Sequence, residues 1–226
     1  VWVSSPGLDM TRSSAPTNLT ASEGSGSVTL NWSAPTDAVV AGYDVYRSVV
    51  DGGYEKISSA LVLGVTYTDD TVHNGLQYYY TVKAVTPAGL KSQASASASA
   101  IPHYNIGWAN LQWPPELTHV ISFNTHTDMV YGQVWIDGVT GQAGATPSLM
   151  AEVGYGPMGS NPTSGWSWFP MTFNTDAGNN DEFKGDMLPH PIGDYDYAVR
   201  YTTTNGRDWL YADLDGTGNG YDPAQA

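Results

Sequence analysis

Apolar and polar residues alternate in short segments along most of this chain, and turn-forming residues separate the segments. In the segment VTLNW, for example, Val28, Leu30 and Trp32 alternate with polar residues. An alternation of period two places the apolar side chains on one face of a β-strand. No segment of the second half repeats its apolar residues with the period of an amphipathic helix. The pattern therefore predicts an all-β protein.

The length of 226 residues suits two modules of about 100 residues each. We expect a linker from an upstream region over residues 1–14, a first module over 15–100, a second over 101–222 and a tail over 223–226. The chain does not begin with Met and is interpreted as an internal segment of a longer polypeptide. It has no apolar run of about 18 residues, so we expect no membrane insertion.

Composition narrows the range of partners. The chain has 15 Tyr, 8 Trp, 25 Gly and 14 Pro, which suits half-buried strands joined by turns. Its net charge of -14 would repel phosphate backbones, so we expect no nucleic-acid partner. It has no Cys, which excludes disulfides and thiolate metal sites. We expect a monomer.

The first module has strand patterns at short intervals. Turns are predicted at Asp51-Gly52-Gly53 and at Asn74-Gly75. After the second turn, one side of the expected strand carries Leu76, Tyr78, Tyr80, Val82 and Ala84. Seven short strands in about 85 residues predict an immunoglobulin-like β-sandwich.

The segments APTNLTA, YDVYR and GLQYYYTVKAV, together with the Trp32 strand, resemble a bacterial extracellular fibronectin type III domain. The resemblance implies that Trp32 is the core tryptophan and that Tyr78 closes a tyrosine corner. We interpret the aromatic residues of this module as core, and the module as a spacer.

The second module contains further strand candidates separated by Gly, Pro, Asn and Asp clusters. They are ELTHVISF, MVYGQVWI, SLMAEVGY, WSWFPMTF, DYDYAVRYT and DWLYADL. A second β-sandwich is predicted. The strings GWANLQWPP, YGQVWIDGVT, FNTDAGNNDEF and YDYAVRYTTTNGRDWLYADLDG resemble an accessory module of amylopullulanases and related starch-degrading bacterial enzymes.

The resemblance implies a non-catalytic part of a secreted or cell-surface α-glucan hydrolase. Its expected partners are an α-glucan (starch, pullulan or glycogen) and an upstream catalytic domain in the same polypeptide. The alternative is a purely structural spacer that positions or stabilises the catalytic domain, or attaches it to the cell surface.

Six tryptophans lie in the second module, and stacking on the C–H face of a sugar needs an exposed aromatic plane. Trp166 and Trp168 are two residues apart and would share a strand face. Seven residues are candidate carbohydrate ligands: Trp166, Trp168, Tyr131, Gln133, Trp135, Trp209 and Tyr211. If every tryptophan of this module were buried, only the structural alternative would remain.

Two oxygen-rich segments, FNTDAGNNDEF and DLDGTGNGYD, suggest a structural calcium ion, because Ca²⁺ prefers several carboxylate and carbonyl oxygens. The candidate ligands are Asp176, Asn179, Asp181, Asp213 and Asp215. Ordinary turn chemistry is the alternative. Ala224 stands where an EF-hand needs its bidentate Glu, so an EF-hand is not expected. We expect no required cofactor.

Catalytic patterns are missing. The sequence contains no HExxH, GxSxG or P-loop motif. Asp181 and Glu182 are adjacent, so in a strand they point to opposite faces and cannot flank one glycosidic bond. The sequence therefore predicts a chain without an active site of its own.

Overall fold

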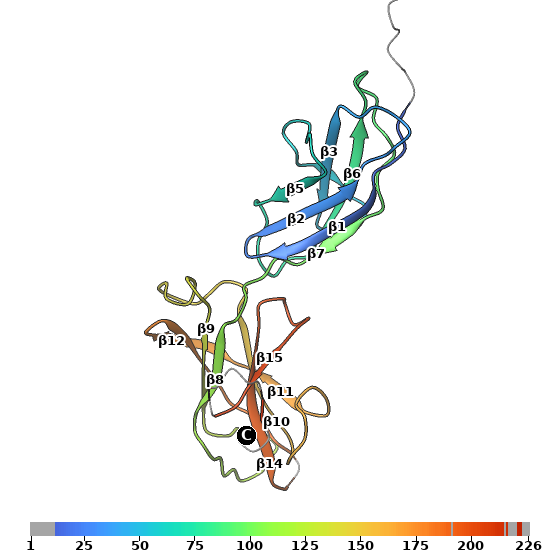
Figure 1. Cartoon of the computed structure of the whole chain (residues 1–226). Coiled ribbons are helices and arrows are strands. Elements are labelled where there is room, and N and C mark those ends of the chain that lie inside the picture. The colour runs from blue at the N-terminus through green and yellow to red at the C-terminus, as the bar shows by residue number, and fades with distance from the viewer. Residues whose placement is uncertain (1–11, 191, 215, 217–220, 223–226) are drawn as a thin grey trace, which may run out of the picture. The chain divides into compact units, whose positions relative to one another are not determined.

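The computed structural model describes residues 12–190, 192–214, 216 and 221–222 (Figure 1). The chain divides into two compact units, Val1–His103 (unit 1) and Tyr104–Ala226 (unit 2). The described residues form strands, turns and loops, and none of them belongs to a helix that could cross a membrane. Most of the expected linker (residues 1–11) and the tail (223–226) lie outside the described residues.

Unit 1 has two antiparallel sheets with the strand orders β1-β2-β5 and β4-β3-β6-β7. The described strands are β1 (Thr17–Gly24), β2 (Ser27–Ser33), β3 (Gly42–Ser48), β4 (Glu55–Lys56), β5 (Thr66–Asp69), β6 (Tyr78–Val85) and β7 (Ala98–Ala100). Together they form the predicted immunoglobulin-like sandwich.

Trp32 and Tyr78 of unit 1 pack as expected, but Tyr46, Tyr54 and Tyr79 are partly exposed and lie outside the core cluster. Trp32 is 5% exposed and meets the edge of Tyr43 in the core. The Tyr78 hydroxyl accepts a hydrogen bond from the backbone N–H of His73 over 3.0 Å, which forms the tyrosine corner. Leu76 was expected to share the buried face but is 50% exposed, because β6 begins only at Tyr78.

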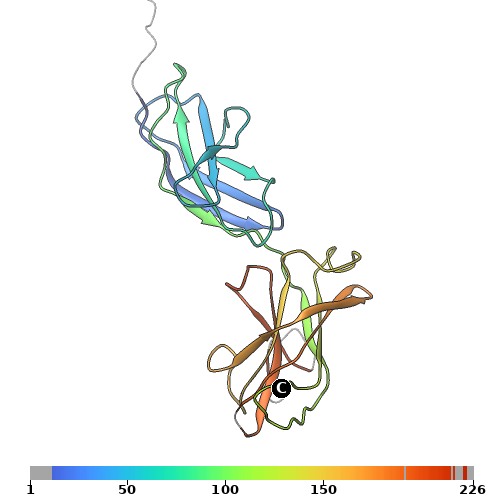
Figure 2. The same cartoon turned by 180° about the vertical axis from the view of Figure 1, so that it is seen from behind.

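Unit 2 is a second sandwich of two four-stranded antiparallel sheets, seen from opposite sides in Figures 1 and 2. One sheet has the order β12-β13-β9-β8, and the other has the order β11-β10-β14-β15. The strands are β8 (Trp108–Trp113), β9 (Val130–Trp135), β10 (Met150–Pro157), β11 (Ser167–Pro170), β12 (Thr172–Ala177), β13 (Asn180–Gly185), β14 (Tyr195–Thr202) and β15 (Leu210–Ala212).

Two strand predictions in unit 2 need correction, and so does the expectation that the first oxygen-rich segment is a loop. The segment 116–123 is a loop, not a strand, and it follows two consecutive prolines that cannot donate to a sheet. The predicted strand 166–173 is divided between β11 and β12, which belong to different sheets. The segment 173–183 is the β12–β13 hairpin and not an open loop.

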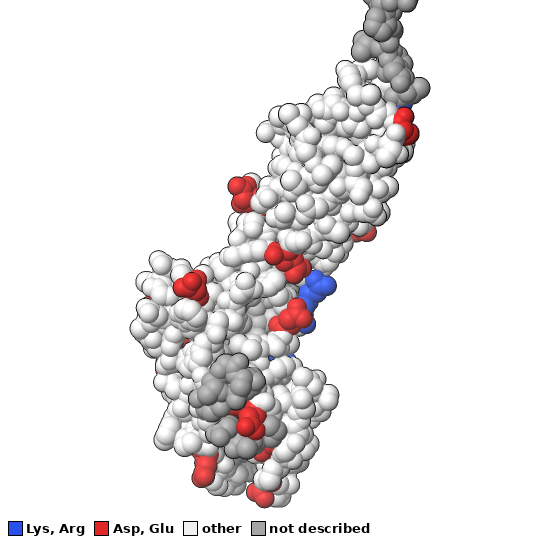
Figure 3. All heavy atoms as spheres, in the orientation of Figure 1, with Lys and Arg blue, Asp and Glu red and all other residues white. Residues whose placement is uncertain are grey.

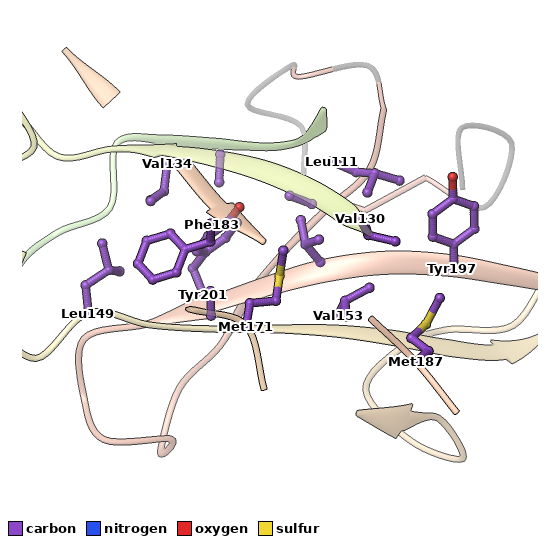
Figure 4. Packing of buried hydrophobic residues seen from close by; sticks show 14 of the residues in the cluster. Leu111, Val130, Val134, Leu149, Val153, Met171, Phe183, Met187, Tyr197 and Tyr201 are labelled. Carbon is purple, nitrogen blue, oxygen red and sulfur yellow. The ribbon is translucent and has the colours of Figure 1, made fainter. Parts of the chain in front are cut away.

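The core of unit 2 lies between its two sheets (Figure 4). It takes Leu111 from β8, Val130 and Val134 from β9, Val153 from β10 and Tyr201 from β14. Because strand side chains alternate, the intervening residues of these strands point to the two outer faces. The tryptophans of unit 2 lie on these outer faces or next to them, and none belongs to the buried core cluster.

Candidate functional site

The first candidate surface is the outer face of the β12-β13-β9-β8 sheet, which we call the amide face. On β9, Tyr131, Gln133 and Trp135 are partly exposed, whereas Val130 and Val134 are fully buried. The strand alternates because its aliphatic side chains fill the core. Two aromatic rings and an amide are thereby placed on one outer row.

Cross-strand pairing with β8 doubles this row. Trp108 pairs with Trp135, Asn110 with Gln133, and Trp113 with Tyr131. Paired residues share a face of the sheet. Trp135 and Tyr131 are four residues apart, so the aromatic pairs are separated by about 13 Å along the strands. The amide face thus has two aromatic ends with an amide pair between them.

Trp113 reaches the amide face through a β-bulge. The register shifts between Leu111 and Trp113, so Gln112 is the extra residue. Without the shift, Trp113 would share the inward face of Leu111, which is fully buried. Instead Trp113 is 59% exposed. β8 is an edge strand of its sheet, which suits the two prolines that follow it.

Hydrogen bonds hold the polar centre of the amide face in place. Asn180 Nδ2 donates to Gln133 Oε1 over 3.0 Å, and the Gln133 N–H donates to Asn110 Oδ1 over 3.2 Å. Beside Gln133 on β13, Glu182 Oε1 accepts from Asn174 Nδ2 over 2.5 Å. These groups form a pre-ordered row of amides and one carboxylate.

The aromatic planes of the amide face are not covered by other rings. No aromatic ring among the described residues stacks on Trp113, Tyr131 or Trp135. Trp135 lies against Gly107, where a Cβ atom would overlap its ring. The ring of Trp135 is therefore positioned on one side and partly exposed.

The second surface is the outer face of the other sheet, where a Trp–Arg stack is formed by Trp166, Trp168, Arg200 and Trp209. The rings of Trp166 and Trp168 are stacked, with centroids 5.5 Å apart and an interplanar angle of 18°. The Arg200 guanidinium carbon lies 4.2 Å from the Trp168 centroid and 4.0 Å from that of Trp209. Arg200 therefore contacts both indoles by cation–π interactions.

Glu152 and two glycines complete the stack. Arg200 Nε and Nη2 donate to Glu152 Oε2 over 2.8 and 2.5 Å. Beneath the indoles, Cβ atoms at Gly154 and Gly156 on β10 would overlap the rings of Trp168 and Trp166. The rings of the stack therefore contact one another, Arg200 and the sheet below.

Two tyrosines border the Trp–Arg stack. Tyr211 lies 5.7 Å from Trp168, and Tyr221 meets Trp166 at 5.5 Å in a perpendicular arrangement. Burial, and then the nearby carboxylates of Asp196 and Asp213, raise the pKa of Tyr221 well above its usual value. Tyr221 therefore stays neutral at physiological pH.

The seven sequence-predicted residues thus lie on two different faces. Tyr131, Gln133 and Trp135 belong to the amide face, and the remaining four lie in or beside the Trp–Arg stack. All six tryptophans of unit 2 are partly or largely exposed, so the outcome in which every indole is buried does not occur.

Three of the five predicted calcium ligands accept hydrogen bonds from backbone N–H groups. Asp176 accepts from the Gly144 N–H over 3.0 Å, and the buried Asp181 accepts from the Thr146 N–H over 3.0 Å. Asp213 Oδ2 accepts from the Asp222 N–H. Asn179 is exposed, and Asp215 is not described. No group of three His, Cys, Asp or Glu side chains in the described ranges is arranged to hold a metal ion, so calcium stays a prediction.

Several residues of these surfaces were not singled out from sequence. They are Asn110 and Asn174 on the amide face, and Arg200 and Glu152 in the Trp–Arg stack. One signal for Arg200 was available in the sequence. Unit 2 contains only three basic residues, and Arg200 lies within a strand whose other residues have a core pattern, so a specific partner for it could be expected. As expected for adjacent strand residues, Asp181 is buried and Glu182 lies on the outer face.

Comparisons with known proteins agree with this architecture. Residues 14–101 match the model of the Fibronectin type III domain. An amylopullulanase of Thermoanaerobacterium thermosulfurigenes is 34% identical over 225 residues, covering 92% of this chain and 12% of that protein. An amylopullulanase of Thermoanaerobacter thermohydrosulfuricus is 36% identical over 229 residues, covering 93% of this chain and 15% of that protein.

A third relative is a chitinase. Chitinase A1 of Niallia circulans is 38% identical over 96 residues, covering 42% of this chain and 13% of that protein. The chain spans less than a fifth of the length of each of these relatives. Its similarity to the amylopullulanases extends over both units.

Proposed function

We propose that this chain, a fibronectin type III domain followed by an accessory β-sandwich of the amylopullulanase type, binds α-glucan through the amide face of its second unit. The chain is non-catalytic in this proposal. It is part of a secreted enzyme that degrades α-glucan, and it keeps the polysaccharide close to a catalytic domain in the same polypeptide.

One observation carries the proposal: partly exposed rings, on which no other ring of the described residues stacks, flank an ordered row of hydrogen-bonding groups. Trp113, Tyr131 and Trp135 supply planes for the C–H faces of glucose residues. Between them, Gln133, Asn110 and Glu182 supply donors and acceptors for hydroxyl groups. An aromatic plane combined with a few fixed polar groups is the usual composition of a site for a small polar ligand.

Charge supports a neutral ligand over an anionic one. Unit 2 contains 14 Asp and Glu residues but only Lys184, Arg200 and Arg207 as basic residues. On the face shown in Figure 3, acidic side chains are scattered among large uncharged areas. A neutral glucan can approach such a surface without repulsion, whereas a phosphorylated polymer cannot.

The Trp–Arg stack favours a structural role for the opposite face. Each of its indoles contacts a neighbouring indole or the Arg200 guanidinium. We therefore assign Trp166, Trp168 and Trp209 to the stability of unit 2, and place glucan binding on the amide face. Weak binding there becomes effective through tethering to the catalytic domain.

Retention on granular starch tests the proposal. We expect the wild-type chain to bind and the double variant Trp113→Ala/Trp135→Ala to lose about tenfold or more in affinity, because two stacking planes are removed. Tyr79→Ala is a matched control, since Tyr79 is a partly exposed strand aromatic of unit 1.

Two outcomes of the starch-retention experiment would contradict the proposal. If the wild-type chain is not retained on starch, the amide face is not a glucan-binding surface, and a structural role for that face is favoured. If Trp166→Ala abolishes retention and the double variant does not, binding belongs to the Trp–Arg stack. Circular dichroism of each variant establishes that the fold is intact.

A further inference from the structure

Unit 2 contains a cavity of about 470 Å³ that is separate from both tryptophan-bearing faces. It is lined by the loops after β8, β10 and β13 and by the residues at the start of β14. These segments meet at one end of the sandwich. The volume is within the range of about 300–1,000 Å³ that is typical of ligand sites. We call this cavity the tyrosine pocket.

Three tyrosines form the walls of the tyrosine pocket. The rings of Tyr155 and Tyr195 are 5.3 Å apart and nearly perpendicular. Tyr155 also stacks on Phe169, which packs against the core. Tyr197 is 8% exposed, and its hydroxyl donates to the Pro114 carbonyl oxygen. The aromatic walls are therefore fixed by the core before any ligand arrives.

The polar groups of the pocket have few partners within the protein. Within the described ranges, neither Glu116 nor Asp194 has a salt-bridge partner. Nε2 of His119 is buried and makes no hydrogen bond to a described residue. A buried polar atom without a partner is costly, which suggests that a ligand or water satisfies it.

The lining also restricts the chemistry of the ligand. It contains two carboxylates and no Lys or Arg, so an anion would be repelled. Burial, and then the charge of Glu116, raise the pKa of Tyr197 to about 12, so this phenol stays neutral and keeps its hydrogen bond to Pro114. Leu117, Ile121 and Met158 add apolar contact surface. Tyrosine rings with carboxylate acceptors match the C–H faces and hydroxyl groups of a neutral sugar.

We infer that the tyrosine pocket is a second carbohydrate site, which takes the terminal glucose residues of an α-glucan chain. That the ligand is an α-glucan rests on the proposed function, but the location of the site and its binding of chain ends do not. A pocket built from the loops at one end of the sandwich admits a chain end. The amide face is a sheet surface, and the middle of a chain can lie along it.

Two oligosaccharides separate the two sites. Maltotriose has chain ends, whereas β-cyclodextrin is a ring of glucose residues without an end. We expect maltotriose to shift the NMR resonances of Tyr195, Tyr197 and Gly193 in the full chain, and β-cyclodextrin to leave these resonances unchanged. Trp113→Ala/Trp135→Ala should not alter the response to maltotriose.

Conservative variants test the residues. Glu116→Gln/Asp194→Asn keeps the side-chain shapes and should weaken maltotriose binding at the pocket about tenfold, because charge-assisted hydrogen bonds are lost. Asp128→Asn, an exposed carboxylate outside the pocket, should have no effect. Retention of the double variant on starch would show that the amide face is intact.

Three outcomes overturn the inference. The first is that maltotriose up to its solubility limit leaves the pocket resonances unshifted. The second is that β-cyclodextrin shifts them as strongly as maltotriose does. The third is that tetramethylammonium binds the pocket much more tightly than maltotriose does, because the pocket would then be an aromatic site for an organic cation. Loss of starch retention by the wild-type chain concerns the amide face and leaves this inference standing.

Discussion

At the residue scale, Arg200 is the side chain that most clearly connects structure to stability in unit 2. Its guanidinium contacts Trp168 and Trp209 and pairs with Glu152. A planar guanidinium can stack flat on a ring while its edge donates two hydrogen bonds to one carboxylate. An ammonium group is not planar and cannot combine these two contacts. Four residues that are distant in sequence are thereby joined on one sheet face.

Replacing Arg200 should destabilise unit 2. We expect Arg200→Ala to lower its free energy of unfolding by about 2 kcal/mol, because cation–π contacts are lost and Glu152 is left without its partner. Arg200→Lys should be intermediate. Urea denaturation followed by tryptophan fluorescence measures the change. Arg207→Ala is the control, since Arg207 is an exposed arginine of the neighbouring turn, and an equal effect of both alanine variants would contradict the role of the stack.

At the element scale, β10 shows how a strand can shape the layer above it. Gly154 pairs with Trp168 of β11 and Ala198 of β14, so the two central strands present only small residues under the indole. Trp168 of the edge strand β11, and Trp166 just before this strand, then lie over β10. The spacing of two residues between Trp166 and Trp168 matches the spacing of Gly156 and Gly154.

A methyl group on β10 should disrupt this layer. We expect Gly154→Ala to cost about 1–3 kcal/mol in the stability of unit 2, because the added Cβ overlaps the Trp168 ring. The change is measured by chemical denaturation, with near-ultraviolet circular dichroism as a readout of the indole environment. In contrast, Gly64→Ala in unit 1 adds its Cβ to open space and should be close to neutral. An unperturbed near-ultraviolet spectrum for Gly154→Ala would refute the close contact.

At the scale of the whole molecule, the chain combines two units with separate cores. The core of unit 1 is built around Trp32, Tyr80 and Val82, and that of unit 2 around Leu111, Val153 and Tyr201. Each unit contains about 100 residues or more, which is enough for hydrophobic burial to support folding without disulfides. The proposed ligand sites belong entirely to unit 2.

Separate expression of the two units tests this division. We expect residues 1–103 and 104–226 to fold as independent fragments, each with a cooperative thermal transition, because each encloses its own core. Starch retention should remain with 104–226 alone. A fragment that unfolds when separated, or starch binding by 1–103, would contradict the division of roles.

The sequence determined the fold class and the content of the cores. Period-two alternation in segments such as 28–32 and 130–136 is a local property, and it identifies which side chains must be buried. The same alternation placed Tyr131, Gln133 and Trp135 together on an outer row. Both resemblances stated from sequence motifs agree with the family match and with the amylopullulanase relatives.

Only the tertiary structure decided which outer-face aromatics keep an open plane. Whether Trp113 points outward depends on a one-residue bulge, and whether Trp168 is covered depends on Arg200 from another strand. The tyrosine pocket likewise collects residues from separate loops at one end of the sandwich. Such contacts arise from strand order and register across distant segments, and local alternation carries no information about them.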